Sequence, residues 1–230
     1  MIDEAVVSLD EVGAGAPAWS LAMLPVRLAE IGAAGALVAV LMVLLWLGPR
    51  PDLATAPGQP FFWVKAVYTG GLALAGLQLV ASLTRRRGTG ALALAAGGVL
   101  VAVMLIAAAT QAGRLEPALL TRLFRPFVIW NCLFNIVSLV APMLVVTVLG
   151  LRGLDLERPA AVGFAAGLFC GGVAATILSL HCPHATFVFV GLWYTVAIAL
   201  CGLAGAAALV IFRRVTRSIA SERPILSVGE

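Results

Sequence analysis

Four consecutive residues, His181-Cys182-Pro183-His184, contain both histidines of the chain and one of its four cysteines. A thiol between two imidazoles can be oxidised, can bind a soft metal ion, or can have no chemical role. Imidazolium charge near such a thiol lowers its pKa and makes the reactive thiolate more available. The element stands between two long hydrophobic runs, so we expect it where a membrane helix reaches water.

The composition indicates an integral membrane protein. Of the 230 residues, 62% are hydrophobic and 11% are charged, whereas a soluble domain has about 25% charged residues. The net charge of +4 does not indicate a nucleic-acid partner, because the basic residues stand in short clusters beside apolar runs. That distribution is typical of residues that orient membrane helices. The acidic N-terminus lacks the positive charge of a secretory signal peptide.

Six hydrophobic runs approach the roughly 20 residues that a helix needs to cross a bilayer. We expect membrane helices over residues 28–48, 61–83, 90–110, 127–149, 160–180 and 186–212. The predicted fold class is therefore an all-α integral membrane protein with six transmembrane helices. A transmembrane domain, residues 28–212, would lie between an N-terminal segment, 1–27, and a C-terminal tail, 213–230.

The basic residues predict that both termini lie in the cytoplasm, because cytoplasmic loops are enriched in Lys and Arg. With that orientation, ten of the 15 basic residues lie on the inner side and five on the outer side. Lys65, near the start of the second run, is expected to extend its ammonium group outward to water. The segment Arg114–Arg125 has one apolar and one charged face, which predicts a short interfacial helix between helices three and four.

The predicted topology divides the four cysteines into two groups, one near the middle of the membrane and one toward its outer side. Cys170 and Cys201 fall near the middle of helices five and six, where cysteine usually serves as a small apolar side chain. Cys132 and Cys182 fall toward the outer side, which in a bacterium faces the oxidising periplasm, where disulfides persist. A bridge requires Cα atoms within about 7 Å, and the sequence leaves this distance open.

Polar residues accompany Cys132 on helix four. Asn131, Asn135 and Ser138 are spaced i, i+4, i+7, close to one face of the helix. Polar side chains within a membrane usually face the bundle or a wet cavity. We therefore expect either a small polar pocket beside Cys132 or hydrogen bonds between helices.

The same region offers candidate metal ligands. His181, Cys182, His184 and Cys132 could supply two nitrogens and two sulfurs, a set that suits zinc and softer metals. Adjacent His and Cys residues make an awkward clamp, however, and no second spaced pair such as CxxC is present. The sequence favours transient binding of a soft metal over a resident cofactor.

Two of the helices carry small residues at every fourth position, a pattern that lets helices approach closely. These residues are Gly163, Gly167 and Gly171 in helix five and Ala197, Cys201 and Gly205 in helix six. We expect the two stripes to hold the bundle together. A homodimer face is the alternative interpretation.

Motifs of common enzymes are missing from the sequence. It has no Gly-rich phosphate loop, Ser-His-Asp set, HExxH motif or carboxylate pair, so we do not expect an enzyme. Proton-coupled transporters usually keep an ionisable relay within the membrane. The six runs contain no Asp or Glu apart from Glu30 at the rim of the first, which argues against that class.

Several of these residues carry a resemblance to a known family. Residues 125–212 resemble NrsF-type negative regulators of extracytoplasmic-function sigma factors, which are six-helix inner-membrane anti-sigma factors of proteobacteria. The matching elements are Cys132-Leu133, Ile136, Ser138-Leu139, Pro142, Leu151-Arg152-Gly153, Arg158-Pro159, Gly163, Gly167, Gly171-Gly172, Leu180-His181-Cys182-Pro183 and Trp193-Tyr194.

The resemblance implies that the cytoplasmic N-terminal segment holds a sigma factor at the bacterial inner membrane. It also implies that Cys132 and Cys182 take part in sensing heavy-metal or oxidative stress. The segment is acidic with an apolar stripe, so it could dock on a basic surface of the partner. Its expected sigma-binding residues are Ile2, Asp3, Glu4, Val6, Leu9, Asp10 and Glu11.

Two other functional classes stay open at the level of sequence. A membrane thiol-disulfide oxidoreductase would use Cys132 and Cys182 for exchange, although such enzymes generally carry a closely spaced pair and these cysteines are 50 residues apart. A small metal or solute permease would depend on Asn131 and Asn135 instead.

Overall fold

The structure is a computed structural model, and it describes residues 23–85, 90–151, 154 and 156–222. These residues form helices joined by short connections, with no strand among them. The helices are α2 (Leu24–Met42) with its π-helical extension η1 (Val43–Leu47), the short 3₁₀ turn η2 (Ala56–Gly58), α3 (Pro60–Arg85), α4 (Gly90–Ala112), α5 (Pro117–Leu123), α6 (Pro126–Leu151), α7 (Pro159–Leu178), α8 (Phe187–Phe189), the π-helical turn η3 (Val190–Tyr194) and α9 (Thr195–Glu222).

Within the described residues, six helices are long and apolar enough to cross a membrane. They coincide with the six predicted runs, so the all-α fold class and the six candidate spans are confirmed. The orientation of the chain in a bilayer stays a prediction. So does the interfacial position of α5, although a helix does form within the predicted segment.

Prolines determine where several helices begin. Pro60, Pro117, Pro126 and Pro159 each stand at the first position of a helix, where the missing N–H has no partner to lose and the fixed φ suits the helix. At the other end of η1, Gly48 adopts φ 80°, a left-handed conformation that favours glycine. The last helix continues to Glu222, ten residues beyond its predicted end, through the arginine-rich segment that follows Phe212.

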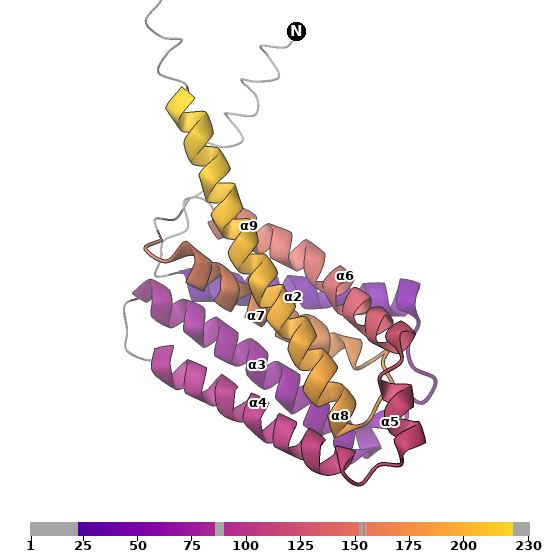
Figure 1. Cartoon of the computed structure of the whole chain (residues 1–230). Coiled ribbons are helices and arrows are strands. Elements are labelled where there is room, and N and C mark those ends of the chain that lie inside the picture. Colours follow the sequence, from indigo (N-terminus) through magenta and orange to yellow (C-terminus); the bar gives the residue numbers. More distant parts are fainter. Residues whose placement is uncertain (1–22, 86–89, 152–153, 155, 223–230) are drawn as a thin grey trace, which may run out of the picture.

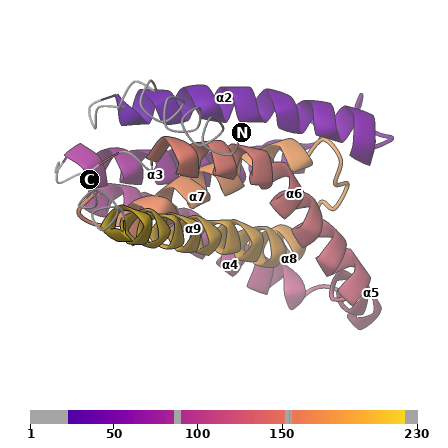
Figure 2. The same cartoon turned by 90° about the horizontal axis from the view of Figure 1, so that it is seen from above.

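Successive long helices run in opposite directions, so the connections gather at two ends of the bundle. We call one of them the cysteine end: there α2, α4 and α7 finish and α3, α6 and α8 begin. Figure 1 shows α5 and α8 together at this end, far from the last turns of α9. In Figure 2, α7 lies between α2 on one side and α9 on the other.

The core of the bundle is built around α7, which packs against α2, α3, α6 and α9. The two predicted stripes of small residues face each other there. A Cβ atom on Gly163 would overlap the backbone of Gly205, and one on Gly167 would overlap the carbonyl group of Cys201. On another side of α7, Gly172 touches the backbone of Ala73 in α3. The stripes therefore hold one chain together, and they are not available for a homodimer.

We predict that Gly167→Ala destabilises the bundle by about 1–3 kcal/mol, the usual cost of overpacking a close contact. Thermal unfolding of the full chain in detergent should show a lower Tm. Gly98→Ala in α4 is the matched control, because nothing lies within 4 Å of the added methyl group and alanine favours helix over glycine. Equal melting temperatures for Gly167→Ala and the wild type would contradict the packing described here.

Candidate functional site

The loop that carries Cys182 is placed by the end of α7. The backbone N–H groups of His181 and Cys182 both donate to the Leu178 carbonyl oxygen, at 3.0 and 2.8 Å. Pro183 then prevents the helix from continuing, because proline disfavours helical geometry in the residue before it. Cys182 is consequently held on the last turn, with only 6% of its surface exposed.

Cys132 lies in the second turn of α6, and the fold brings it to Cys182. It is 4% exposed, its thiol interacts with that of Cys182, and the two residues line one cavity. Both thiols are unbridged, as are Cys170 and Cys201. Cys170 and Cys201 are buried among the helices, and Cys170 Sγ lies 3.7 Å from Thr147 Oγ1. The two cysteines singled out as a pair thus meet at the cysteine end.

Lys65 also belongs to this site, which the sequence analysis did not predict. Its side chain points inward and is 3% exposed, so the expected outward extension to water is wrong. Nζ donates to the Cys182 carbonyl oxygen at 3.1 Å and lies 4.6 Å from the centroid of the Tyr194 ring. The carbonyl dipole and the aromatic face replace water around the ammonium group. The sequence contains one indication that Lys65 is unusual: it is the only lysine among 15 basic residues.

Tyr194 closes the site from the side of η3. It is fully buried, at the end of a π-helical turn, a helix irregularity often found at functional sites. Its hydroxyl is buried near Cys182 and has no hydrogen-bond partner within the described part of the chain. A buried polar atom without a partner is unusual in native structures.

The surroundings of Cys182 lower the pKa of its thiol. The largest cause is the hydrogen bond from Cys132, followed by the positive charge of Lys65 and by donors from Tyr194 and the His184 backbone, while burial acts in the opposite direction. A lowered pKa means a larger thiolate fraction, which is the form that reacts with oxidants and binds metals.

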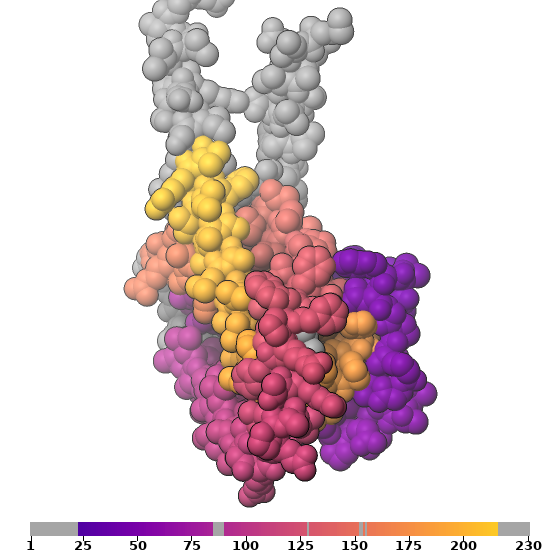
Figure 3. All heavy atoms as spheres, turned by 45° about the vertical axis from the view of Figure 1, so that its right-hand side comes forward, coloured from indigo at the N-terminus to yellow at the C-terminus, as the bar shows by residue number. Residues whose placement is uncertain are grey.

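A small polar cavity opens beside the two thiols, with a volume of about 150 Å³. Its lining residues are Phe127, Asn131, Cys132, Asn135, Leu178, His181, Cys182, Pro183 and His184. In Figure 3 the orange segment that follows α7 reaches the surface between α6 and the indigo spheres of α2. The polar pocket expected beside Cys132 therefore exists, with one correction: Ser138 does not line it, because Ser138 lies a further turn along α6.

The histidines make contacts of their own. His181 Nδ1 lies 2.7 Å from the Gly48 carbonyl oxygen and must be the donor, because a carbonyl only accepts. The His184 ring packs on Phe189 with 4.3 Å between centroids. Across the described residues, no group of three or more His, Cys, Asp or Glu side chains is placed to hold a metal ion. The four predicted soft-metal ligands line one cavity without forming a ready-made metal centre.

The Cys182 loop is tied to the end of α2. Besides the bond from His181 to Gly48, the Arg50 backbone N–H donates to the Leu180 carbonyl oxygen at 2.9 Å. The Arg50 side chain is held by Asp52 through Nε and Nη2, at 2.6 and 2.5 Å. This pairing raises the pKa of Arg50 and lowers the pKa of Asp52. A change at Cys182 can therefore be transmitted to α2 through backbone contacts.

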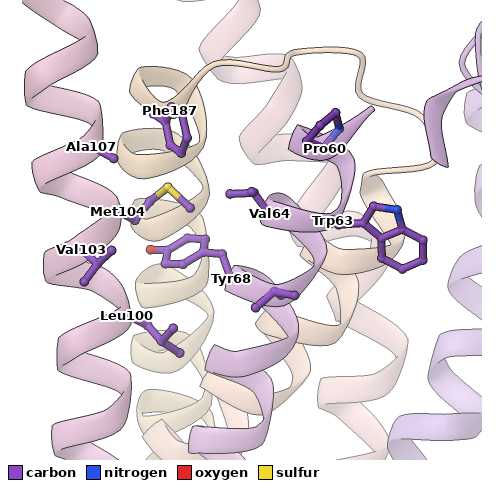
Figure 4. A pocket seen from close by; sticks show the side chains of 10 residues that line it. Pro60, Trp63, Val64, Tyr68, Leu100, Val103, Met104, Ala107 and Phe187 are labelled. Carbon is purple, nitrogen blue, oxygen red and sulfur yellow. The ribbon is translucent and has the colours of Figure 1, made fainter. Parts of the chain in front are cut away.

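The cavity between α3 and α4 is of a different kind. It measures about 370 Å³ and is lined almost entirely by apolar side chains such as Val64, Leu100 and Met104 (Figure 4). The Tyr68 hydroxyl is paired with Thr195 Oγ1 at 2.5 Å. This groove offers no titratable or nucleophilic group that is free for chemistry, and its lining suits hydrocarbon.

Comparison with known proteins now identifies the class of this molecule. The family described as "NrsF: Negative regulator of sigma F" matches residues 14–215. The chain belongs to the NrsF family. It is 42% identical over 184 residues to the anti-sigma-F factor NrsF of Caulobacter vibrioides, covering 79% of this chain and 85% of that protein. It is 36% identical over 163 residues to a probable anti-sigma-F factor NrsF of Azospira oryzae, covering 71% and 75%. No solved structure matches.

Membership of the NrsF family confirms the resemblance stated from the sequence. The match begins at residue 14, so it leaves out the first 13 residues, which include all the residues expected to bind the sigma factor. Those expected residues, Ile2, Asp3, Glu4, Val6, Leu9, Asp10 and Glu11, lie outside the part of the chain that the structure describes.

We predict that mild oxidation of the purified, reduced chain forms a disulfide between Cys132 and Cys182, because both free thiols line the same small cavity. Non-reducing digestion and mass spectrometry should detect this linked peptide, and Cys132→Ser should abolish it. If Cys182 instead links to Cys170 or Cys201, the arrangement of α6 and α7 described here is wrong.

Proposed function

We propose that this NrsF-family chain sequesters an extracytoplasmic-function sigma factor at the bacterial inner membrane. The partner is held by the cytoplasmic N-terminal segment and is released when Cys132 and Cys182 are oxidised or bind a soft metal ion. The observation that carries the proposal is the meeting of these two thiols beside a buried cation, in a chain whose relatives are named anti-sigma factors.

An even number of membrane spans places both termini on one side of the bilayer. Six candidate spans are present in the described residues, and the excess of arginine on the side of the termini supports a cytoplasmic location for that side. A sigma factor works in the cytoplasm, so the N-terminal segment is on the correct side to bind it. The cysteine end then faces the periplasm, where oxidants and metal ions arrive first.

The signal has a physical route across the membrane along α2. At the cysteine end, α2 and η1 are tied to the Cys182 loop by the His181–Gly48 and Arg50–Leu180 hydrogen bonds. Along its length α2 packs on α6 and α7: Gly32 contacts Phe169 and Gly35 contacts Met143. The other end of α2 begins at Leu24, within the last residues of the predicted N-terminal segment 1–27.

The free energy needed to release the sigma factor is similar in size to the free energy of the hydrogen bonds that hold the Cys182 loop. A tenfold weakening of sigma-factor binding requires about 1.4 kcal/mol of difference between two states of the bundle. Each hydrogen bond to the Cys182 loop contributes about 0.5–1.5 kcal/mol. Displacing this loop by a disulfide or a bound metal therefore supplies enough free energy to release the partner, provided that α2 moves with it.

The alternative functions receive less support. The relatives are named as anti-sigma factors, which are regulators rather than enzymes, so the oxidoreductase class has no counterpart among them. A permease would require a polar path through the bundle. The polar cavity at the thiols measures only about 150 Å³, and the cavity of about 370 Å³ between α3 and α4 is apolar.

We predict that Cys182→Ser reduces stress induction of the sigma factor's target genes by at least about tenfold, because serine neither bridges to Cys132 nor binds a soft metal; this corresponds to about 1.4 kcal/mol of lost coupling. A reporter gene in cells treated with peroxide or a cadmium salt measures it. Cys170→Ser is the matched control and should leave induction intact. Wild-type induction in Cys182→Ser would remove the sensor role from this residue.

We predict that deletion of residues 2–12 abolishes repression in unstressed cells, because it removes the acidic, apolar-striped segment expected to hold the sigma factor. Reporter activity should then be high without any stress. Deletion of residues 224–230 from the C-terminal tail is the control, and repression should persist. Repression by the N-terminal deletion variant would move the binding site to another cytoplasmic segment.

A further inference from the structure

We propose that the bundle binds one anionic phospholipid between α3 and α4 at the cysteine end. One acyl chain of this lipid fills the apolar groove between the two helices, and Arg114 binds the phosphate of its headgroup. The inference rests on the shape and chemistry of two adjoining cavities, and it goes beyond the proposed function without depending on it.

The length of the groove suits an acyl chain from one leaflet. Its lining extends from Pro60 to Tyr68 on α3 and from Ala107 back to Leu100 on α4. At about 1.5 Å per residue, these segments are about 12 and 10 Å long, and half of the hydrocarbon core is about 15 Å thick. Because Pro60 begins α3, the groove starts at the end of a candidate span and reaches toward its middle.

The polar side-chain groups of the groove are already paired. Trp63 Nε1 donates to the Pro57 carbonyl oxygen at 2.9 Å, and the Tyr68 hydroxyl is paired with that of Thr195. The rest of the lining is apolar. Trp63 is 57% exposed and Val103 is 61% exposed, so the groove is open along its outer side. A hydrocarbon chain is therefore the occupant that the groove favours.

A second cavity continues the groove at the end of α4. It measures about 280 Å³ and shares Ala107 and Phe187 with the groove, so the two spaces adjoin. Figure 4 shows these two residues together at one end of the groove. The other lining residues of the second cavity are mostly polar: Thr110, Gln111, Arg114 and Leu115. The apolar groove thus leads into a polar site at the end of the spanning helices.

Arg114 supplies a positive charge to this polar site. Its side chain is exposed, and the ion pairs recorded among the described residues involve other arginines. Its guanidinium group therefore has no carboxylate partner there, and the planar array of N–H donors suits the oxygens of a phosphate. Gln111 Oε1 accepts from the Val188 backbone N–H at 3.1 Å, which leaves the –NH₂ group of Gln111 as a second donor.

The charge around Arg114 favours an anionic lipid over a zwitterionic one. Residues 114–125 contain three arginines, Arg114, Arg122 and Arg125, and one acidic residue, Glu116. Of these four side chains, Arg114 lines the second cavity and the others line neither space. Basic pockets between membrane helices bind anionic headgroups. Charge complementarity therefore distinguishes this site from a groove that any lipid of the bilayer would fill.

A lipid bound here would contact the segment that follows the Cys182 loop. Phe187 is the first residue of α8 and lines both cavities. Its ring packs edge-on against Phe61 of α3, with 4.9 Å between centroids. An occupied groove therefore supports the packing of α8 against α3.

The test is native mass spectrometry of the delipidated full chain in detergent, with phosphatidylglycerol and phosphatidylcholine that carry the same acyl chains. We expect phosphatidylglycerol to bind the wild type at least about tenfold more tightly, the ratio that one charge-assisted hydrogen bond supplies. Arg114→Gln should reduce its binding to the level of phosphatidylcholine. Arg122→Gln is the matched control, because Arg122 lines neither cavity, and it should keep the preference.

A second pair of variants tests the groove. Val103→Phe places a ring in the groove and should weaken phosphatidylglycerol binding by about tenfold. Val99→Phe is its matched control: Val99 lies one turn away on α4, is also 61% exposed and lines neither cavity. All four substituted positions are exposed, so the variants should unfold in detergent at the Tm of the wild type.

Three results would overturn the proposal. Equal binding of both lipids by the wild type would exclude an anionic site, and loss of the preference in Arg122→Gln as well as in Arg114→Gln would assign it to the general charge of this end. Unchanged binding in a folded Val103→Phe protein would remove the acyl chain from the groove. The measurement contains neither a sigma factor nor an oxidant, so its failure leaves the proposed function untouched.

Discussion

The site depends on one interaction, the meeting of the Cys182 and Cys132 thiols, next to a buried ammonium group that is bonded to the Cys182 carbonyl oxygen. Cys182 is supplied by the end of α7, Cys132 by α6 and Lys65 by α3, so the contact exists only when three helices pack closely. Gly172 permits the close approach of α7 to α3, and Gly167 permits that of α7 to α9, by leaving no side chain between the helices. The chemistry at one end of the bundle and the packing in its middle are therefore a single arrangement.

In our proposal, this arrangement transmits a structural change from the thiols to the opposite side of the membrane. The loop around Cys182 is bonded to the backbone at Gly48 and Arg50, and these residues follow the helix that connects to the N-terminal segment. The interior along α2 is tightly filled, for example by Phe169 against Gly32. Tightly packed interiors transmit displacement rather than absorb it. In our proposal, α2 is therefore the element that carries the signal.

Much of the fold could be predicted, because helix length and apolar runs are local properties of the sequence. Topology predicted that Cys132 and Cys182 fall at the same end of the bundle, but the distance between them could not be predicted, because it depends on how α6 packs against α7. Lys65 could not be placed in this way: the expectation that lysine extends to water assumes a lipid neighbour, whereas this side chain faces a carbonyl and an aromatic ring. The absence of Ser138 from the cavity lining and the continuation of α9 beyond Phe212 likewise depend on contacts that the spacing of residues does not show.

The central claim is that a change at the thiols releases a sigma factor bound on the opposite side of the membrane. Its most direct test is co-purification of the full chain from native membranes in mild detergent, with and without a thiol oxidant, and identification of its partners by mass spectrometry. We expect a sigma factor to be retained under reducing conditions and lost on oxidation. A sigma factor retained equally in both conditions would contradict the switch, and its absence from both would contradict the function.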